Sequence, residues 1–354
     1  MAKVFLVECD SSEPRDVLER KIEALWTGAG LAAAFSPRDL TAVKLHVGEP
    51  GTTTFVPPDI VAPLVGLVAA TGAQPFLTDS AVLYKSPRDN GIGHARVALA
   101  HGFTPERIGA PFIPADGLDG SDAQEVEVVG EHFDTVSIAS AIVRARSMLV
   151  ITHATGHLGT GFGGALKNLG MGCCSRMGKL RQHHGQQPRI DPDRCDACAA
   201  CAEWCPVNAI EVDEHAAIDN ERCIGCGECI AACREGAVEF DWGIMGRQLQ
   251  ERIVEHAAAV VRAKPKRIAH VTVAQRITRN CDCLGLSEQA LLPDIGLLAS
   301  FDPVAIDHAV LDLVRQRSGT SLEALAHPQH DASIQIRYAQ AMGVGSADVE
   351  IVTL

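Results

Sequence analysis

The stretch Cys195-x2-Cys198-x2-Cys201-x3-Cys205-Pro206 decides the fold of one segment of this chain, and Cys223-x2-Cys226-x2-Cys229-x3-Cys233 repeats it. Gaps of two residues let three successive thiolates surround one iron–sulfur cube, and the fourth cysteine of each run reaches the other cube. The spacing therefore predicts two 4Fe-4S clusters. The expected ligands are, for the first cluster, Cys195, Cys198, Cys201 and Cys233, and for the second, Cys223, Cys226, Cys229 and Cys205.

Two other uses of these eight cysteines are a pair of zinc ribbons and a disulfide framework. Zinc ribbons usually offer their ligands as two separated pairs, so two identical four-cysteine runs fit them poorly. The runs resemble the bacterial two-cluster ferredoxin over residues 188–242. Pro206 keeps that family's pattern, whereas Arg234 stands where its second run often has proline.

Composition predicts a cytoplasmic protein. The chain has 13 cysteines, no signal peptide and no apolar run long enough to span a bilayer, which favours reduced thiols and no membrane span. Residues 188–242 hold 13 acidic and four basic side chains, and so nine of the 13 net negative charges. Such a surface predicts a basic redox partner protein and argues against nucleic-acid binding. Solubility alone is the other interpretation.

The rest of the chain predicts one α/β body into which the cysteine segment is inserted. Apolar, β-branched runs occur at residues 4–7, 42–47, 75–78, 147–152 and 268–273. Helix-period segments occur at residues 14–26, 58–70, 94–101, 246–263 and 303–317. This alternation favours a largely parallel sheet with helices on both faces. The predicted units are therefore a discontinuous α/β body (1–187 and 243–354) and a small α+β ferredoxin-like insert (188–242).

A glycine-rich loop follows the predicted strand at 147–152, and it reads THATGHLGTGFGGALKNLGMG over residues 152–172. Glycine lets backbone N–H groups converge on an anion, so such a loop before a helix can hold a phosphate or a carboxylate. Tight packing of a helix on a sheet also selects glycine. The cradle interpretation predicts backbone contacts from Gly161, Gly163 and Gly164, with Lys167 beside them.

Further polar residues stand at or just after predicted strand ends, where open α/β sheets place their ligand crevice. We expect Lys44, Arg88 and Lys167 to bind a small anionic ligand or cofactor. The candidate catalytic residues are His46, His153, His157 and Lys167, because a histidine is the natural group for proton transfer near neutral pH.

Cys281 and Cys283 are separated only by Asp282. Two thiols at this spacing can share one metal, form a redox disulfide or bracket a substrate. Together with Cys173 or Cys174 and a histidine of the glycine loop they would form a third metal site. The alternative is that these cysteines are packing residues and unpaired thiols.

Several segments resemble the domain-of-unknown-function 362 family over nearly the whole chain. They are 44–51 (KLHVGEPG), 78–84 (TDSAVLY) with Arg88 and Asn90, 161–173 (GFGGALKNLGMGC), 281–283, 293–296 and 300–307 (SFDPVAID). This resemblance implies a ferredoxin insert in an α/β body. The glycine loop is also similar to that of the lactate racemase family, which holds a nickel-pincer cofactor with a histidine and a lysine. Here His157, Gly161–Gly164 and Lys167 keep that order, without the serine of the family's loop.

Together these patterns predict an iron–sulfur oxidoreductase that passes electrons from two 4Fe-4S clusters to a ligand or metal site in the α/β body. The alternative is a non-catalytic electron carrier or maturation factor that binds a small anionic ligand. Turnover of the ligand by the reduced protein would separate the two functions from each other.

Overall fold

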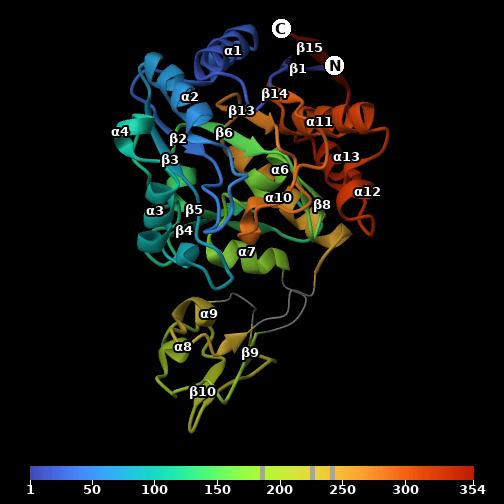
Figure 1. Cartoon of the computed structure of the whole chain (residues 1–354). Coiled ribbons are helices and arrows are strands. Elements are labelled where there is room, and N and C mark those ends of the chain that lie inside the picture. The colour runs from blue at the N-terminus through green and yellow to red at the C-terminus, as the bar shows by residue number, and fades with distance from the viewer. Residues whose placement is uncertain (184–187, 224–227, 240–243) are drawn as a thin grey trace.

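The computed structural model describes residues 1–183, 188–223, 228–239 and 244–354. Its main element is a seven-stranded sheet (Figure 1). In order across the sheet, the strands are β15 (Val349–Thr353), β1 (Ala2–Val7), β14 (Gly296–Ser300), β13 (Ile268–Ala274), β6 (Ser147–His153), β2 (Leu40–Lys44) and β3 (Gln74–Thr78). Only β14 runs antiparallel to its two neighbours, and the other pairs are parallel. The predicted α/β class with a largely parallel sheet is confirmed.

Helices cover both faces of this sheet (Figure 1). The α-helices of this part of the chain are α1 (Arg15–Gly28), α2 (Pro58–Ala70), α3 (Gly91–Ala100), α4 (Pro105–Ile108), α5 (Ser140–Arg144), α6 (Ala165–Gly170), α7 (Arg176–His183), α10 (Arg247–Ala263), α11 (Pro303–Ser318), α12 (Leu322–Ala326) and α13 (Ser333–Ala341). Three short 3-10 helices are η1 (Leu31–Ala34), η2 (Pro87–Asp89) and η3 (Asp282–Leu284). Two hairpins stand beside the main sheet, β4 (Ala123–Glu127) with β5 (Thr135–Ala139) and β7 (Thr155–His157) with β8 (Gly161–Gly163).

Two layers of buried apolar side chains hold the helices on the sheet. Leu149 and Ile151 of β6 face one layer, which also contains the buried residues of α1 and α2. Met148 and Val150 of the same strand face the other layer, beneath α6 and α10. All seven residues of β6 are buried, as expected for a central strand covered on both sides. Alternation along this one strand therefore places α1 and α2 on one face and α6 and α10 on the other.

Local signals fix where α11 begins and ends. The Asp302 side chain accepts hydrogen bonds from the N–H groups of Val304 (2.8 Å) and Ala305 (2.9 Å), and Pro303 occupies the first turn. Gly319 ends the helix with a φ of 74°, a left-handed conformation that glycine adopts without steric cost.

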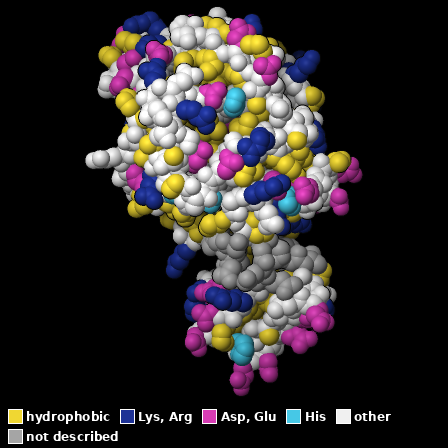
Figure 2. Space-filling model, turned by 90° about the vertical axis from the view of Figure 1, so that its right-hand side faces the viewer, with side chains coloured by type: hydrophobic (Ala, Val, Ile, Leu, Met, Phe, Trp, Pro, Cys, Tyr) yellow, Lys and Arg dark blue, Asp and Glu magenta, His cyan; other side chains and the backbone are white. Residues whose placement is uncertain are grey.

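A small unit is formed by the described residues of 188–239, and Figure 1 shows it apart from the sheet and its helices. Its elements are β9 (Arg189–Ile190), α8 (Ala200–Glu203), β10 (Ile210–Val212), β11 (Ala216–Ile218), α9 (Glu228–Ala232) and β12 (Val238–Glu239). It has its own apolar cluster, which includes Cys201, Ile210 and Val238. Acidic side chains are scattered over its visible face in Figure 2. The predicted boundary at residue 242 lies outside the described residues, so the limits of the insert stay a prediction.

Within the described ranges, none of the helices combines the length and the apolar character that crossing a bilayer requires.

Candidate functional site

A cavity of about 670 Å³ opens at the carboxyl ends of β2, β3 and β6. Lys44 and His46 come from the end of β2, Asp79 follows β3, and His153 ends β6. Because these three strands are parallel, their carboxyl ends meet at one edge of the sheet, where α/β proteins place their ligands. The turn at 281–284 forms a further part of the wall. The structure thus brings polar residues far apart in the sequence to one hollow.

Asp79 is the centre of a buried ionic network beside the cavity. Its carboxylate lies 3.0 Å from the Lys44 ammonium, 3.4 Å from the Arg88 guanidinium and 3.5 Å from the His94 ring. Burial alone would raise the pKa of Asp79, but Lys44 and His94 hold it well below its usual range. Lys44 also donates to the amide oxygen of Asn168 at 2.7 Å. Lys44 is therefore held in place by two partners.

Arg88 is equally well paired. Its side chain is buried, and Nε donates to Glu49 Oε2 at 2.6 Å. Nη2 donates to the Tyr84 hydroxyl at 2.7 Å, which in turn donates to Glu49 at 3.2 Å. The predicted ligand-binding residues Lys44 and Arg88 thus lie at the cavity, but their charges are balanced by Asp79 and Glu49.

Lys179 and Asp116 are two further buried, oppositely charged side chains that sequence reasoning missed. Lys179 donates to the hydroxyl of Ser80 at 2.7 Å and to its carbonyl oxygen at 3.1 Å. Asp116 accepts from the backbone N–H of Ala81 at 3.0 Å. Burial raises the pKa of Asp116 to about 6, and the positive charge of Lys179 opposes this shift. Both residues fix the loop that follows β3.

Lys167 differs in its partners from Lys44 and Lys179, the two buried lysines of the cavity wall. Within the ranges that the structure describes, its ammonium has no hydrogen-bond acceptor and no carboxylate at ion-pair distance. Burial lowers its pKa to about 8, and the nearby Lys44 contributes to the shift. A positive group that faces a cavity without a counterion is a suitable binding point for an anion. The predicted role of Lys167 is thus compatible with its position.

The glycine loop forms the β7–β8 hairpin and leads into α6. At the start of α6, the N–H groups of Ala165 and Leu166 donate to the carboxylate of Asp307 at 2.6 and 2.9 Å. A side chain at Gly164 would collide with that carboxylate, and Gly161 has a φ of 78°. The anion at this helix start is therefore an internal one from α11. Gly163 and Gly164 line the cavity, but the loop glycines also meet packing and conformational demands.

The three candidate histidines all line the cavity and have different partners. His46 Nδ1 accepts from the Gly48 N–H at 3.0 Å, and burial together with Arg88 lowers its pKa well below 6.5. Burial also lowers the pKa of His157, with a further contribution from Lys167. His153 donates to Asp282 at 2.9 Å and to the Gln275 carbonyl at 2.9 Å. Burial disfavours its charge, but Asp282 raises the pKa of His153 above its usual value.

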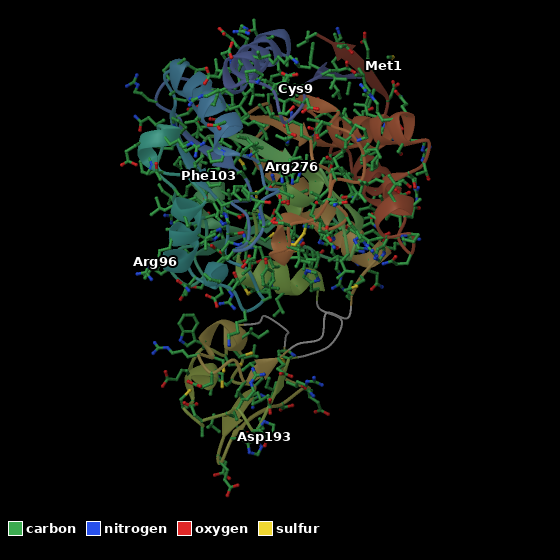
Figure 3. The ribbon with its side chains drawn as sticks, viewed as in Figure 1. Met1, Cys9, Arg96, Phe103, Asp193 and Arg276 are labelled. Atoms are coloured by element: carbon green, nitrogen blue, oxygen red, sulfur yellow. A yellow bond between two sulfur atoms is a disulfide. The ribbon has the colours of Figure 1, made fainter. Side chains whose placement is uncertain are left out.

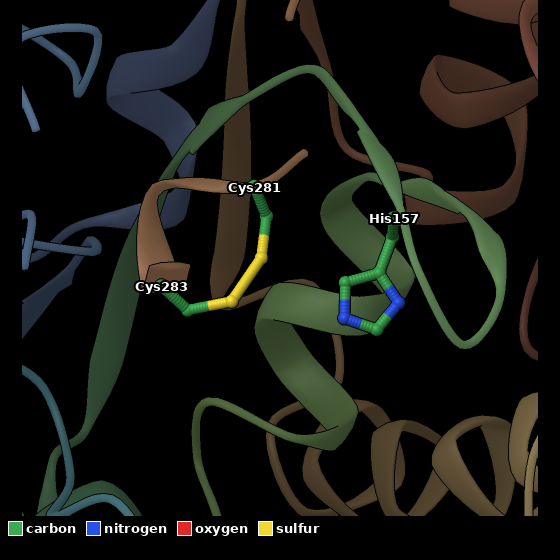
Figure 4. A group of neighbouring side chains, drawn as sticks. All are labelled: His157, Cys281 and Cys283. Carbon is green, nitrogen blue, oxygen red and sulfur yellow. A yellow bond between two sulfur atoms is a disulfide. The ribbon is translucent and has the colours of Figure 1, made fainter. Parts of the chain in front are cut away.

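Cys281 and Cys283 form a disulfide on the cavity wall. The yellow sulfur–sulfur bond drawn in Figure 3 is this disulfide. Both sulfur atoms and one ring nitrogen of His157 lie within 4.8 Å of one another (Figure 4). Of the alternatives for this pair, the structure contains the disulfide. Cys173 and Cys174 are fully buried in the core beneath α10 and do not join the group.

The described cysteines of the two runs lie in the small unit, and Cys195, Cys198, Cys201, Cys205 and Cys233 are free thiols. One small hollow there is lined by cysteines from both runs, namely Cys195, Cys198, Cys201 and Cys233. Backbone N–H groups donate to three of the sulfurs: Ala216 to Cys195 (3.4 Å), Ala209 to Cys205 (3.2 Å) and Ala237 to Cys233 (3.2 Å). Cys226 falls outside the described residues.

The family model described as "Domain of unknown function (DUF362)" matches residues 41–312. The chain belongs to the DUF362 family. The match begins within β2 and ends within α11, so it contains every residue of the cavity wall named above. The comparison with curated protein sequences gave no match.

Two solved structures resemble this DUF362 chain weakly. The lactate racemase apoprotein from Thermoanaerobacterium thermosaccharolyticum has 11% identity and a TM-score of 0.36, over 77% of this chain and 51% of that one. A structural-genomics protein from Thermotoga maritima has 10% identity and a TM-score of 0.41, over 77% and 52%. The chain thus covers about half the length of each. Likeness at this level carries no argument about function.

Proposed function

We propose that the protein is an iron–sulfur oxidoreductase in which the small unit holds two 4Fe-4S clusters and the cavity of the α/β body holds the ligand that is oxidised or reduced. The observation that carries the proposal is the set of four cysteines around one hollow. Three come from the first run and Cys233 comes from the second, which is the crossed arrangement that the spacing predicts.

The chemistry of these residues fits an iron–sulfur cluster. Cys195, Cys198, Cys201, Cys205 and Cys233 are free thiols, and backbone N–H groups already point at the sulfurs of Cys195, Cys205 and Cys233. Hydrogen bonds to cluster sulfurs are one of the means by which a protein sets the reduction potential. Once bound, such clusters supply electrons one at a time.

The cavity supports the second half of the proposal. It offers an ammonium at Lys167 that has no partner among the described residues, and neutral rings at His46 and His157. Lys44 and Arg88 bring positive charges that Asp79 and Glu49 balance, which leaves Lys167 as the group most suited to a ligand carboxylate or phosphate. We therefore expect the ligand to be a small anion.

Two cysteine variants test the crossed ligation. Cys201→Ser should remove mainly the first cluster, whereas Cys205→Ser should remove mainly the second cluster although both residues belong to the first run. Paramagnetic resonance of the dithionite-reduced proteins reports the loss, with Cys9→Ser as a control outside the runs. Loss of the same cluster in both variants would contradict the assignment.

The oxidoreductase is distinguished from an electron carrier by the fate of the ligand. The reduced protein should convert a small anion that it binds, and Lys167→Met should weaken both binding and conversion. Tight binding of an anion that leaves unchanged after many equivalents of electrons would favour the carrier.

A further inference from the structure

We propose that Cys281 and Cys283 are a redox-active pair that exchanges two electrons with a small anionic disulfide held in the cavity by Lys167. The inference deepens the proposed function and rests on it only for the source of the electrons that reduce the pair. It assigns a chemical class of substrate to the cavity and a reacting bond to its wall.

The first observation is the position of the disulfide. Both cysteines are half-buried and line the cavity of about 670 Å³, so a small molecule that enters can reach the sulfur atoms. The other described cysteines of the α/β body, Cys9, Cys173 and Cys174, are buried and lie off the cavity wall. Cys281 and Cys283 therefore differ from these three cysteines because a small molecule in the cavity can reach their sulfur atoms.

The second observation is how the turn between the two cysteines is anchored. The Asp282 carboxylate accepts from His153 at 2.9 Å and from the Thr54 hydroxyl at 3.1 Å, and its backbone carbonyl accepts from the Glu49 N–H at 3.1 Å. These contacts do not involve sulfur. They hold the turn in place whether the sulfur–sulfur bond is formed or broken, so both thiols stay on the cavity wall after reduction.

His157 supplies a hydrogen-bonding group for the reduced form. Its Nδ1 lies 3.2 Å from the Gly159 N–H and 2.9 Å from the Thr160 hydroxyl, so this nitrogen is engaged within the loop. Figure 4 shows the ring beside the two sulfurs, and one of its nitrogens lies within 4.8 Å of both. With Nδ1 engaged, Nε2 is the nitrogen available to a cysteine sulfur. As an acceptor it takes a hydrogen bond from a thiol, and as a donor it stabilises a thiolate, so either tautomer favours the reactive form of a cysteine.

The reaction balances without any other group. Reduction of the pair breaks its sulfur–sulfur bond and consumes two electrons from an iron–sulfur donor and two protons from water. One cysteine thiolate then attacks a sulfur of the bound disulfide and releases the first product thiol. The second cysteine attacks the mixed disulfide, which re-forms the Cys281–Cys283 bond and releases the second product thiol.

The first test uses the full chain, purified without oxygen and equilibrated with mixtures of reduced and oxidised dithiothreitol, so it does not depend on the clusters. Trypsin releases residues 280–315, which contain these two cysteines and no other. Alkylation followed by mass spectrometry should find this peptide either unmodified or doubly modified, with the ratio set by the buffer. A pair that stays reduced in every mixture, or that stays oxidised in excess reductant, would overturn the proposal. So would a reduced pair that retains one tightly bound zinc ion and resists alkylation.

The second test compares two substrates for the reduced chain, 3,3′-dithiodipropionate, which is anionic, and 2-hydroxyethyl disulfide, which is neutral. Lys167→Met should slow the reaction of the anionic disulfide by about tenfold or more, since an ion pair in the cavity is lost. It should change the neutral reaction by less than about twofold, because the thiol chemistry is intact. The matched control is Lys85→Met, which removes an exposed lysine from the wall of the same cavity. Equal effects of Lys167→Met on the two substrates, or equal effects of both lysine variants, would overturn the role of Lys167.

Cys281→Ser and Cys283→Ser should each abolish release of the second product thiol, and full turnover by either variant would overturn the role of the pair.

Discussion

Replacement of Asp79 by asparagine tests whether the ionic network beside the cavity is as tightly coupled as its geometry implies. The change keeps the shape of the side chain and removes a buried negative charge that lies 3.0 Å from Lys44 and 3.4 Å from Arg88. Removing one member of a buried ion pair typically costs about 3–5 kcal/mol, because the remaining charge is left without compensation. Lys44 keeps Asn168 at 2.7 Å and Arg88 keeps Glu49 at 2.6 Å. We therefore expect the lower end, a loss of about 3 kcal/mol in the free energy of unfolding.

Urea unfolding of the oxygen-free protein, followed by far-ultraviolet circular dichroism, measures this loss. The matched control is Asp16→Asn, which removes an exposed carboxylate that pairs with Arg20 at 2.9 Å. An exposed pair of this kind contributes at most about 1 kcal/mol. If Asp79→Asn were as stable as Asp16→Asn, the network would not be the buried, coupled unit described here.

Three further outcomes are expected. His270 is buried in β13, and burial lowers its pKa to about 3, below the 6.5 of the unfolded chain. The contribution of neutral His270 to the free energy of unfolding is therefore present above pH 6.5 and is lost as the pH falls. The loss is about 2 kcal/mol between pH 7 and pH 5. Urea titrations of His270→Leu should lack this part of the acid sensitivity. Binding of adipate, an unreactive dianion, should weaken as the pH rises through about 8, where Lys167 loses its proton, and calorimetry with Lys167→Met should detect no such step. Deletion of 189–241 with a short flexible linker should leave a soluble body with a cooperative unfolding transition, and insoluble product would contradict the predicted insertion.

The sequence was sufficient for five of the seven strands of the main sheet because their signals are local. Each of the five apolar runs overlaps a strand, although the run at 42–47 extends beyond the end of β2, and the segment 58–70 coincides with α2. The antiparallel strand β14 and the parallel edge strand β15 were missed. The five residues of β14, GLLAS, contain no β-branched side chain, and its partners β1 and β13 are defined only by long-range pairing.

The candidate site was predictable where a residue follows a strand, as Lys44 and His46 do. It was not predictable where a distant side chain completes the structure. The Asp307 carboxylate accepts from the N–H groups at the start of α6, which the glycine loop was predicted to present to a ligand. Asp307 is 142 positions away from Ala165 in the sequence. Lys179 and Asp116 carry no local pattern that distinguishes a buried charge from a solvated one. The place of Lys179 in a short helix among mostly polar neighbours predicts exposure, whereas the structure buries it.

The most direct measurement of the central claim is the metal and sulfide content of the full chain purified without oxygen. Two 4Fe-4S clusters predict about eight irons and eight sulfides per chain, with a broad visible absorbance that dithionite bleaches. Reduction should also give the paramagnetic signal of two interacting clusters. A stoichiometric zinc content with no sulfide and no visible absorbance would contradict the account.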